Sequence, residues 1–228
     1  MPLKLYSHPL ASFCHKALIA LYEGGVAFEP VLVDFGDARS VAAFKAVWPM
    51  AKMPVLHDEQ RGRTVAESTA VIEYLDAFYP GAHRLLPADP DRAWQARMWD
   101  RFYDHYVHEP MQKIVTDRLR PQGAKDGFGV DQAHALIGVA YAVADRALEG
   151  KTWMLGDDFT LADCAAAPAL FYADLVAPLG AHQHLSGYLD RLMARPSYAR
   201  VLAEAEPYFG MFPMDNKPKR VRSGAAPA

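Results

Sequence analysis

The chain has 228 residues, of which 51% are hydrophobic and 22% charged. This balance is that of a folded globular protein rather than a disordered chain, and the length allows one large or two small domains. A formal net charge of −3 gives no basic excess, so nucleic acid is not expected as a partner.

Two cysteines, Cys14 and Cys164, are too few for a disulfide scaffold or a four-cysteine zinc site. Both fall in apolar helical patterns, so we expect buried, reduced thiols in a chain that stays in the cytoplasm. The first ten residues lack the apolar core of a signal peptide. No uncharged apolar run approaches about 18 residues, so no membrane span is expected.

Short apolar runs alternate with helical periods over the first 80 residues. The expected elements are strands at 3–6, 28–33, 55–57 and 64–66 and helices at 12–22, 40–47 and 68–79. The last two strands flank a turn at Arg61-Gly62 and predict a hairpin. A βαβ unit needs two parallel strands, so the added hairpin makes the sheet mixed, with helices on its faces. This is a thioredoxin-like arrangement.

Proline and glycine between residues 80 and 90 mark a linker, and strand signals fade beyond it. The expected helices are a long one from about 90 that Pro110 interrupts, a second at 133–148, a third starting at Thr160, and shorter ones at 186–194 and 197–205. We therefore expect an α/β thioredoxin-like N-terminal domain at 1–81 and an all-α helical domain at 88–210. Residues 211–228 are expected to be a flexible tail, with a basic string at Lys217, Lys219, Arg220 and Arg222.

Four local segments carry a resemblance to a known family. Residues 5–16 look like its first strand, active-site loop and first helix, and Lys52-Met53-Pro54-Val55-Leu56 is similar to a Lys-Val-Pro-x-Leu segment whose proline is cis. Glu67-Ser68 matches a Glu-Ser pair before the third helix, and Thr160 to Asp163 is similar to the capping box of the core helix. In this order and spacing, the chain resembles the cytosolic glutathione transferases over about residues 1–210, with the bacterial-type, serine-type loop.

The resemblance implies a glutathione site with glutathione as co-substrate. Met53, turned by the cis bond to Pro54, is expected to offer its backbone to the cysteinyl part of glutathione. Ser68 at a helix N-terminus suits the γ-glutamyl carboxylate, and Glu67 the ammonium group. Lys52 is expected to pair with the glycyl carboxylate. Local alternatives remain: a strand-start proline, a plain helix cap and a solvated lysine.

The residue that activates the thiol departs from the family pattern, because Ala11 occupies the place where serine-type members carry their serine. Ser12, its neighbour at an expected helix N-cap, is the first choice as catalytic residue. Cys14 would instead imply a mixed disulfide with glutathione, as in the omega- and beta-like branches. Tyr6 and Ser7 at the end of the first strand are the remaining alternatives.

The resemblance also implies a second pocket beside the long helix, in which Tyr103 and Tyr106 are expected to face the electrophile; simple core packing is the alternative. His105 and His108 have the i, i+3 spacing that metal sites use, and Glu109 is adjacent, but no further ligands follow, so no metal is expected. The missing Cys-x-x-Cys excludes a dithiol oxidoreductase. The glycines form neither a phosphate-binding loop nor a dinucleotide fingerprint.

The expected function is attack of the glutathione thiolate on small, hydrophobic electrophiles, as in detoxification. One alternative is a glutathione-dependent isomerase or dehalogenase. Another, which Ala11 keeps open, is a non-catalytic glutathione-binding stress protein, since fold alone does not fix function. The resemblance also implies a homodimer.

Overall fold

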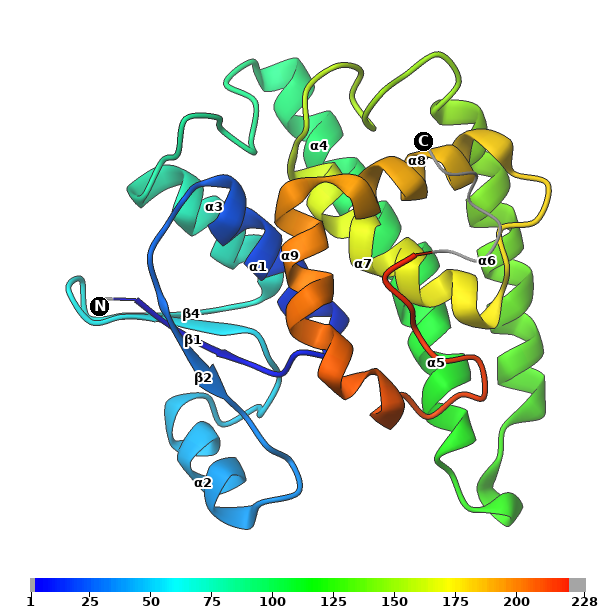
Figure 1. The fold of residues 1–228 in the computed structure, drawn as a ribbon, viewed down its shortest axis with the longest axis horizontal. Helices are drawn as coiled ribbons and strands as arrows, with labels where there is room; N and C mark the ends of the chain where they lie inside the picture. The colour runs from blue at the N-terminus through cyan, green and yellow to red at the C-terminus, as the bar shows by residue number, and fades with distance from the viewer. Residues whose placement is uncertain (1–2, 222–228) are drawn as a thin grey trace.

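The computed structural model describes residues 3–221, and its N-terminal part is a four-stranded sheet with helices on both faces (Figure 1). Strand order is β2-β1-β3-β4, with β1 and β2 parallel and the other pairs antiparallel. The elements are β1 (Leu3–Ser7), α1 (Ser12–Glu23), β2 (Glu29–Leu32), α2 (Ala38–Val47), β3 (Val55–Asp58), β4 (Arg63–Ala66) and α3 (Ser68–Phe78). The expected mixed sheet and hairpin are confirmed.

Alternation along β1 explains the two layers. Leu3 and Leu5 are buried in the main core with apolar residues of α1 and α3. Tyr6 points to the opposite face, where its ring stacks on Phe44 of α2 at a centroid distance of 5.9 Å. Successive side chains of a strand point to opposite faces, so one short strand fixes α1 and α3 on one side of the sheet and α2 on the other.

The C-terminal part is helical. Its elements are α4 (Pro90–Phe102), η1 (Tyr103–His108), α5 (Glu109–Arg118), η2 (Gln122–Ala124), α6 (Gly127–Ala147), α7 (Leu161–Val176), α8 (Gln183–Ala194), α9 (Pro196–Ala205) and η3 (Glu206–Met211). Helix α6 starts earlier than expected, because the Asp126 side chain accepts a hydrogen bond from the Gly129 amide and caps a glycine-rich first turn. No helix among residues 3–221 is long and apolar enough to cross a membrane.

The expected interruption at Pro110 is wrong. The chain stays helical from residue 90 to 118, and Pro110 lies in the first turn of α5. Proline cannot donate the amide hydrogen that a continuous α-helix requires, and the segment immediately before α5, η1, is π-helical. The helix thus continues past the proline with a local change of pitch rather than a break.

Helix α7 runs through the centre of the helical domain and begins with the expected capping box at Thr160 and Asp163. The fully buried Asp163 carboxylate accepts hydrogen bonds from the Met154 and Thr160 amides, both at 2.8 Å, and from the Tyr188 hydroxyl at 2.5 Å. Burial raises the pKa of Asp163, while these donors oppose the shift. One carboxylate therefore joins the loop before α7 to α8.

The expectation of a flexible tail from residue 211 is wrong for its first residues. Phe212 is buried, and its ring packs at 5.4 Å from that of Tyr172 in α7. The side chain of Arg118 pairs with Asp215 at 2.8 Å. Phe212, which follows η3, therefore packs this part of the chain against the core. Arg222, the last residue of the basic string, lies outside the described residues.

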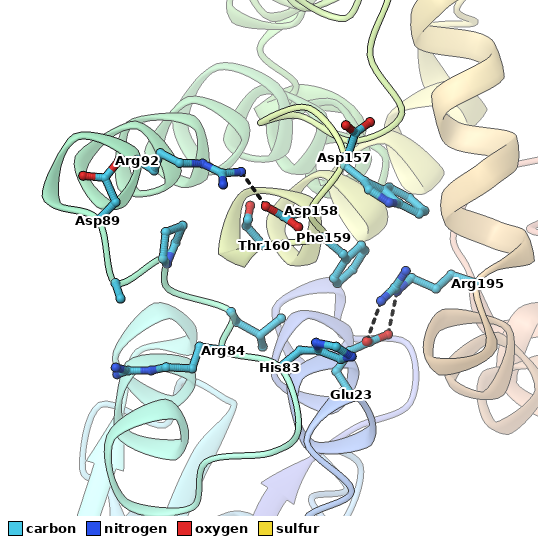
Figure 2. Close-up of a pocket in the computed structure, with 14 residues that line it drawn as sticks. Glu23, His83, Arg84, Asp89, Arg92, Asp157, Asp158, Phe159, Thr160 and Arg195 are labelled. Carbon is cyan, nitrogen blue, oxygen red and sulfur yellow. Dashed lines mark hydrogen bonds and ion pairs between the residues drawn. The ribbon is translucent and has the colours of Figure 1, made fainter.

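The two parts of the molecule also meet at an outer cavity of about 530 Å³, lined by the interdomain linker and by the loop before α7 (Figure 2). Glu23 at the end of α1 accepts two hydrogen bonds of 2.7 Å from Arg195, which precedes α9. The Arg195 guanidinium also lies 3.8 Å from the centroid of the Phe159 ring. We call this pairing of Glu23 with Arg195 the outer junction.

Candidate functional site

Two cavities adjoin at the start of α1 and share Phe13, Lys52 and Met53. The larger, of about 640 Å³, has mostly apolar walls that include Leu10, Phe35 and Leu119, with Ser12 among its lining residues. The smaller, of about 170 Å³, is polar. Its other lining residues are Pro54, Glu67, Ser68, Thr69, Arg101, Asp104, His105 and Glu109. An apolar space thus opens beside a narrow charged one.

Ser12 is the first residue of α1, and Ala11, not Ser12, is the N-cap. The expected capping role is therefore wrong, because the Ser12 hydroxyl is hydrogen-bonded to Nε2 of His108 at the end of η1. Ser12 is 6% exposed and lines the larger cavity. The structure thus places this hydroxyl where a helix N-terminus, an apolar cavity and a buried histidine meet.

The other candidates for thiol activation are placed differently. Cys14 is fully buried, and burial raises the pKa of its thiol to about 12, which removes the reactive thiolate. Tyr6 stacks on Phe44 beneath the sheet, and Ser7 is buried at the end of β1. Of the four candidates, Ser12 alone is a lining residue of these two cavities.

The five residues expected to hold glutathione are brought together. Lys52, Met53, Pro54, Glu67 and Ser68 all line the smaller cavity, and the peptide bond between Met53 and Pro54 is cis, as expected. Ser68 is the first residue of α3, so the amides of that helix end point toward the cavity. Glu67 before it has φ +68°, an unusual value for a residue with a side chain. Such backbone strain concentrates at functional sites.

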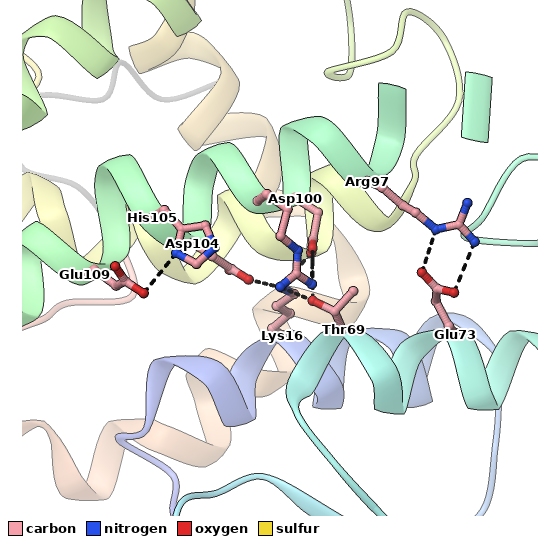
Figure 3. Close-up of polar contacts among 9 residues, drawn as sticks. Lys16, Thr69, Glu73, Arg97, Asp100, Asp104, His105 and Glu109 are labelled. Carbon is pink, nitrogen blue, oxygen red and sulfur yellow. Dashed lines mark hydrogen bonds and ion pairs between the residues drawn. The ribbon is translucent and has the colours of Figure 1, made fainter. Parts of the chain in front are cut away.

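A buried ion cluster lies behind the smaller cavity (Figure 3). Nζ of Lys16 in α1 lies 2.5 Å from Oδ1 of Asp100, an ion-pair contact without hydrogen-bond geometry. The same ammonium donates to Asp104 at 2.8 Å and to Thr69 at 2.9 Å. Burial raises the pKa of Asp104, and the Asp100 carboxylate adds to the rise, whereas Lys16 opposes it. We call Lys16, Thr69, Asp100 and Asp104 the inner junction, because it joins α1 and α3 to α4 and η1.

The expectation that Tyr103 faces the electrophile is wrong. Tyr103 is fully buried, and its hydroxyl donates to the Met154 sulfur at 3.2 Å. Tyr106 is half exposed beside Phe102 and is not among the lining residues of either cavity. The helical domain lines the larger cavity instead with Gln112 of α5 and with Leu119, the residue that follows this helix. A π-helical turn holds more residues than an α-turn, so η1 rotates the side chains away from the pattern that the sequence predicts.

His105, His108 and Glu109 have the spacing of metal ligands, although the sequence predicts no metal site and favours an ordinary polar helix face. His105 pairs with Glu109 at 2.9 Å on the exposed side of the helix, whereas His108 is buried against Ser12 and Phe13. Among residues 3–221, no group of three or more His, Cys, Asp or Glu side chains could hold a metal ion. The apolar residues Val107 and Met111 near His108 are the sequence signal that could have identified it, rather than His105, as the buried histidine.

Comparison with known proteins shows the family to which the chain is related. Residues 1–77 match the family described as Glutathione S-transferase, N-terminal domain, and residues 105–196 match Glutathione S-transferase, C-terminal domain. Glutathione S-transferase 3 of Zea mays is 30% identical over 89% of this chain and 94% of its own. Protein LigF of Sphingobium sp. (strain NBRC 103272 / SYK-6) is 28% identical over 90% of this chain and 95% of its own.

A solved structure has a similar fold. Glutathione S-transferase mrad2831_1084 of Methylobacterium radiotolerans JCM 2831, in complex with glutathione sulfonate, superposes with a TM-score of 0.75. The match covers 87% of this chain and 93% of that one, at 29% identity. The two family matches together span most of the chain and include both parts of the fold. This chain belongs to the glutathione S-transferase family.

Proposed function

We propose that this protein binds glutathione in the smaller cavity and transfers the glutathionyl group, through its sulfur, to small, hydrophobic electrophiles held in the larger one. The observation that carries the proposal is the meeting of three distant segments, around Ser12, Met53 and Ser68, at the walls of two adjoining cavities. The relative from Methylobacterium radiotolerans, solved with glutathione sulfonate, supports the choice of ligand.

The smaller cavity offers complementary charges to the γ-glutamyl end of glutathione. Ser68 begins α3, where free amides and the helix dipole attract a carboxylate. Glu67 supplies a carboxylate for the ammonium group. The Met53 backbone is proposed to pair with the cysteinyl residue, and the exposed Lys52, which lines both cavities, with the glycyl carboxylate.

Ser12 is the proposed catalytic residue, as donor of a hydrogen bond to the sulfur of glutathione. A free thiol has a pKa near about 8.5, and lowering it by two units requires about 2.7 kcal/mol of preference for the thiolate. A hydrogen bond to a charged group contributes about 1.5–3 kcal/mol. The N-terminus of α1 adds a dipole of the right sign. In the transfer, the thiolate forms a bond to an electrophilic carbon, and the leaving group departs with its electron pair.

The binding half of the proposal is tested by calorimetry. Ser68→Ala and Glu67→Ala should each weaken glutathione binding by about 1–3 kcal/mol, because each removes one side-chain partner of a charged group of the ligand. Unchanged affinity in both variants contradicts the proposed site. Chlorodinitrobenzene, a generic electrophile, then tests turnover: tight binding without conjugation would favour the non-catalytic alternative.

The catalytic half is tested with Ser12→Ala and Cys14→Ala. Ser12→Ala should raise the pKa of bound glutathione by about one to two units, equivalent to the hydrogen bond that is lost. The ultraviolet absorbance of the thiolate reports this pKa. Cys14→Ala should leave conjugation intact because that thiol is buried. The reverse result, with the thiolate kept in Ser12→Ala and activity lost in Cys14→Ala, supports mixed-disulfide chemistry.

A second reaction of the same site is suggested by the likeness to LigF, a beta-etherase of Sphingobium sp. strain SYK-6. There the thiolate would attack a carbon that carries an aryloxy group, forming a C–S bond and releasing a phenolate. The apolar walls of the larger cavity suit an aromatic substrate. Release of phenol from an aryl ether, measured beside conjugation of chlorodinitrobenzene, distinguishes this ether cleavage from general transferase activity.

We also propose a cytoplasmic homodimer that acts in detoxification, with domains at 1–81 and 88–210. Trp94 and Met98, one turn apart on α4, are 56% and 42% exposed, and α4 is bridged to α3 by the pair of Arg97 with Glu73 at 2.8 Å. Exposed apolar groups on adjoining helices favour contact with a second copy. Light scattering should give twice the mass of the chain, and Met98→Glu should lower it.

A further inference from the structure

The hydroxyl of Ser12 has an unexpected partner. His108, at the end of η1 and 2% exposed, is hydrogen-bonded through Nε2 to Ser12 Oγ. The ring of Phe13 lies over the same imidazole at a centroid distance of 3.9 Å. Two consecutive residues of α1 therefore fix both the position and the orientation of this histidine.

The imidazole of His108 is neutral at physiological pH. Burial, together with the nearby Lys16 ammonium, lowers the pKa of His108 to about 3. The charged groups near this ring are Lys16 of α1 and, one turn earlier on η1, Asp104, which are paired with each other; Glu109 follows it in α5 and is paired with His105. A neutral imidazole carries a single proton, so one ring nitrogen donates and the other accepts.

Burial decides which nitrogen carries that proton. Within residues 3–221, Nδ1 of His108 has no hydrogen-bond partner. A proton on Nδ1 would leave a buried N–H donor unpaired, and orphaned donors are rarer in proteins than under-used acceptors. His15, one turn after Ser12 on α1, shows the same arrangement. Its Nε2 must donate to the Pro9 carbonyl oxygen, and its Nδ1 is likewise unpartnered in the described structure. The proton of His108 therefore belongs on Nε2.

The direction of the hydrogen bond then sets the role of Ser12. If Nε2–H donates to Oγ, the serine proton is free to donate to a second acceptor. Ser12 lines the larger cavity, so an anion in that cavity is the available acceptor. Hydrogen bonds in a chain polarise one another, which makes the hydroxyl a stronger donor than a lone serine. The opposite tautomer would use the serine proton on the ring and leave nothing for a ligand.

We propose that His108 is a positioning residue that orients the Ser12 hydroxyl as a donor to the sulfur of glutathione. The inference rests on the proposed function, in which Ser12 stabilises the thiolate. It assigns a purpose to the π-helical segment: η1 brings a histidine of the helical domain onto the first turn of α1. It also explains why the activating serine lies one position away from the place that the family pattern assigns to it. Ser12 acts as the donor because it meets its partner, His108 of the helical domain.

A matched pair of variants tests the direction of the bond. His108→Gln keeps an N–H donor near the position of Nε2, and His108→Met has a similar shape without a donor. In His108→Met the ratio of thiolate to thiol in bound glutathione at pH 6.5 should fall about tenfold, which is a rise of about one pKa unit. His108→Gln should restore most of the thiolate. Glutathione affinity should change less than twofold, because the cavity residues that hold the peptide are untouched.

Two further measurements separate the inference from the proposed function. In the double variant Ser12→Ala/His108→Met, the thiol pKa should be no higher than in Ser12→Ala alone, because His108 acts through Ser12. If Ser12→Ala raises the thiol pKa but His108→Met does not, or if the two effects add, the inference is overturned and the role of Ser12 stands. If Ser12→Ala has no effect, both fall.

The tautomer can also be read without any ligand. Nitrogen-15 chemical shifts of the His108 ring in the free protein should show protonated Nε2 and bare Nδ1 at pH 7. A proton on Nδ1 overturns the inference even if the variants fail to fold. Far-ultraviolet circular dichroism of each variant confirms that the changes in thiol pKa come from folded protein.

Discussion

Two charged junctions hold α1 against the helical domain, and they differ in how far water reaches them. At the inner junction, the Lys16 side chain is 1% exposed and that of Asp100 is 0% exposed. At the outer junction, the Glu23 and Arg195 side chains are 14% and 24% exposed and lie at the edge of an open cavity (Figure 2). The same helix thus uses ion pairs in a dry and in a wet setting, two turns apart.

The two junctions also differ in what they adjoin. Thr69 and Asp104 of the inner junction line the smaller cavity, so the group that aligns the two domains is also a wall of the candidate glutathione site (Figure 3). The outer junction shares no residue with either site cavity. Changes at the inner junction should therefore affect both stability and binding, whereas changes at the outer junction should affect only stability.

The largest expected effect is that of Lys16→Met, which breaks the inner junction. It leaves the buried Asp104 carboxylate without its cation and leaves Asp100 with the Arg101 guanidinium alone, at 2.9 Å. Removing one partner of a buried ion pair costs about 3–5 kcal/mol. Urea unfolding measures the loss. Lys4→Met is the matched control, because Lys4 pairs with Glu59 at 2.6 Å on the surface, with side chains 29% and 46% exposed. The control should lose much less, because water screens a surface ion pair; equal losses in the two variants contradict the comparison.

Asp163→Ala measures how much a buried carboxylate contributes to stability when its partners are neutral donors rather than a cation. This carboxylate is satisfied by neutral donors, the amides of Met154 and Thr160 and the hydroxyl of Tyr188. Losing the cap and leaving those donors unpaired should lower the free energy of unfolding by about 2–4 kcal/mol. Asp157→Ala, on the exposed loop nearby, is the control. Glutathione affinity of the folded variant should be unchanged, and a binding defect at normal stability would contradict a purely structural role.

Much of the fold could be predicted because its signals are local. Glycine and proline end helices, alternating apolar residues mark strands, and the Thr160 capping box is a four-residue pattern. Each of these features is decided by neighbours in the sequence, so a single chain suffices to detect them. The residues expected to bind glutathione are different, because their roles are implied by the resemblance to a known family whose short motifs they match.

The features that the sequence did not reveal depend on contacts between distant residues. Lys16 sits among the apolar residues of α1, and only the fold brings Asp100 and Asp104 to it. The π-helical turn of η1 changes the phase of the helix, so Tyr103 enters the core and His108 meets Ser12. Phe212 looks like part of a tail until the surface of α7 is there to receive it. Burial of polar groups is a tertiary property.

Two buried histidines, one on α1 and one packed against it, should also make the stability of the protein depend on pH. Burial lowers the pKa of His15 to about 4, and burial with Lys16 lowers that of His108 to about 3, whereas an unfolded histidine titrates near 6.5. Between these values the unfolded chain binds more protons, so stability falls as pH falls, by about 1.4 kcal/mol per pH unit for each histidine. Asp104 and Asp163, whose pKa values are raised, act in the opposite sense.

Comparison of variants isolates the histidine contribution. The free energy of unfolding is measured at pH 7, 6 and 5 in the parent chain and in His15→Gln. Below pH 6 the free energy of unfolding should change less steeply with pH in His15→Gln, and the difference in slope should correspond to one proton. His134→Gln is the control, because His134 is exposed on α6. Parallel slopes in the parent and His15→Gln would mean that the buried ring takes up a proton in the folded state.

The smallest expected effect is that of Glu23→Gln at the outer junction. An ion pair that water reaches typically contributes about 0–1 kcal/mol, and the two-pronged geometry seen here places Glu23 and Arg195 at the upper end of that range. Arg195→Leu should cost more, because the guanidinium also lies over the rings of Phe159 and Trp153, at 3.8 and 5.0 Å, and such contacts add about 0.5–1 kcal/mol. Salt screens charges that water reaches, so 1 M sodium chloride should reduce the cost of Glu23→Gln and leave that of Lys16→Met nearly unchanged. A cost for Glu23→Gln as large as that for Lys16→Met, or equal salt dependence of the two, would show that water access does not distinguish the junctions.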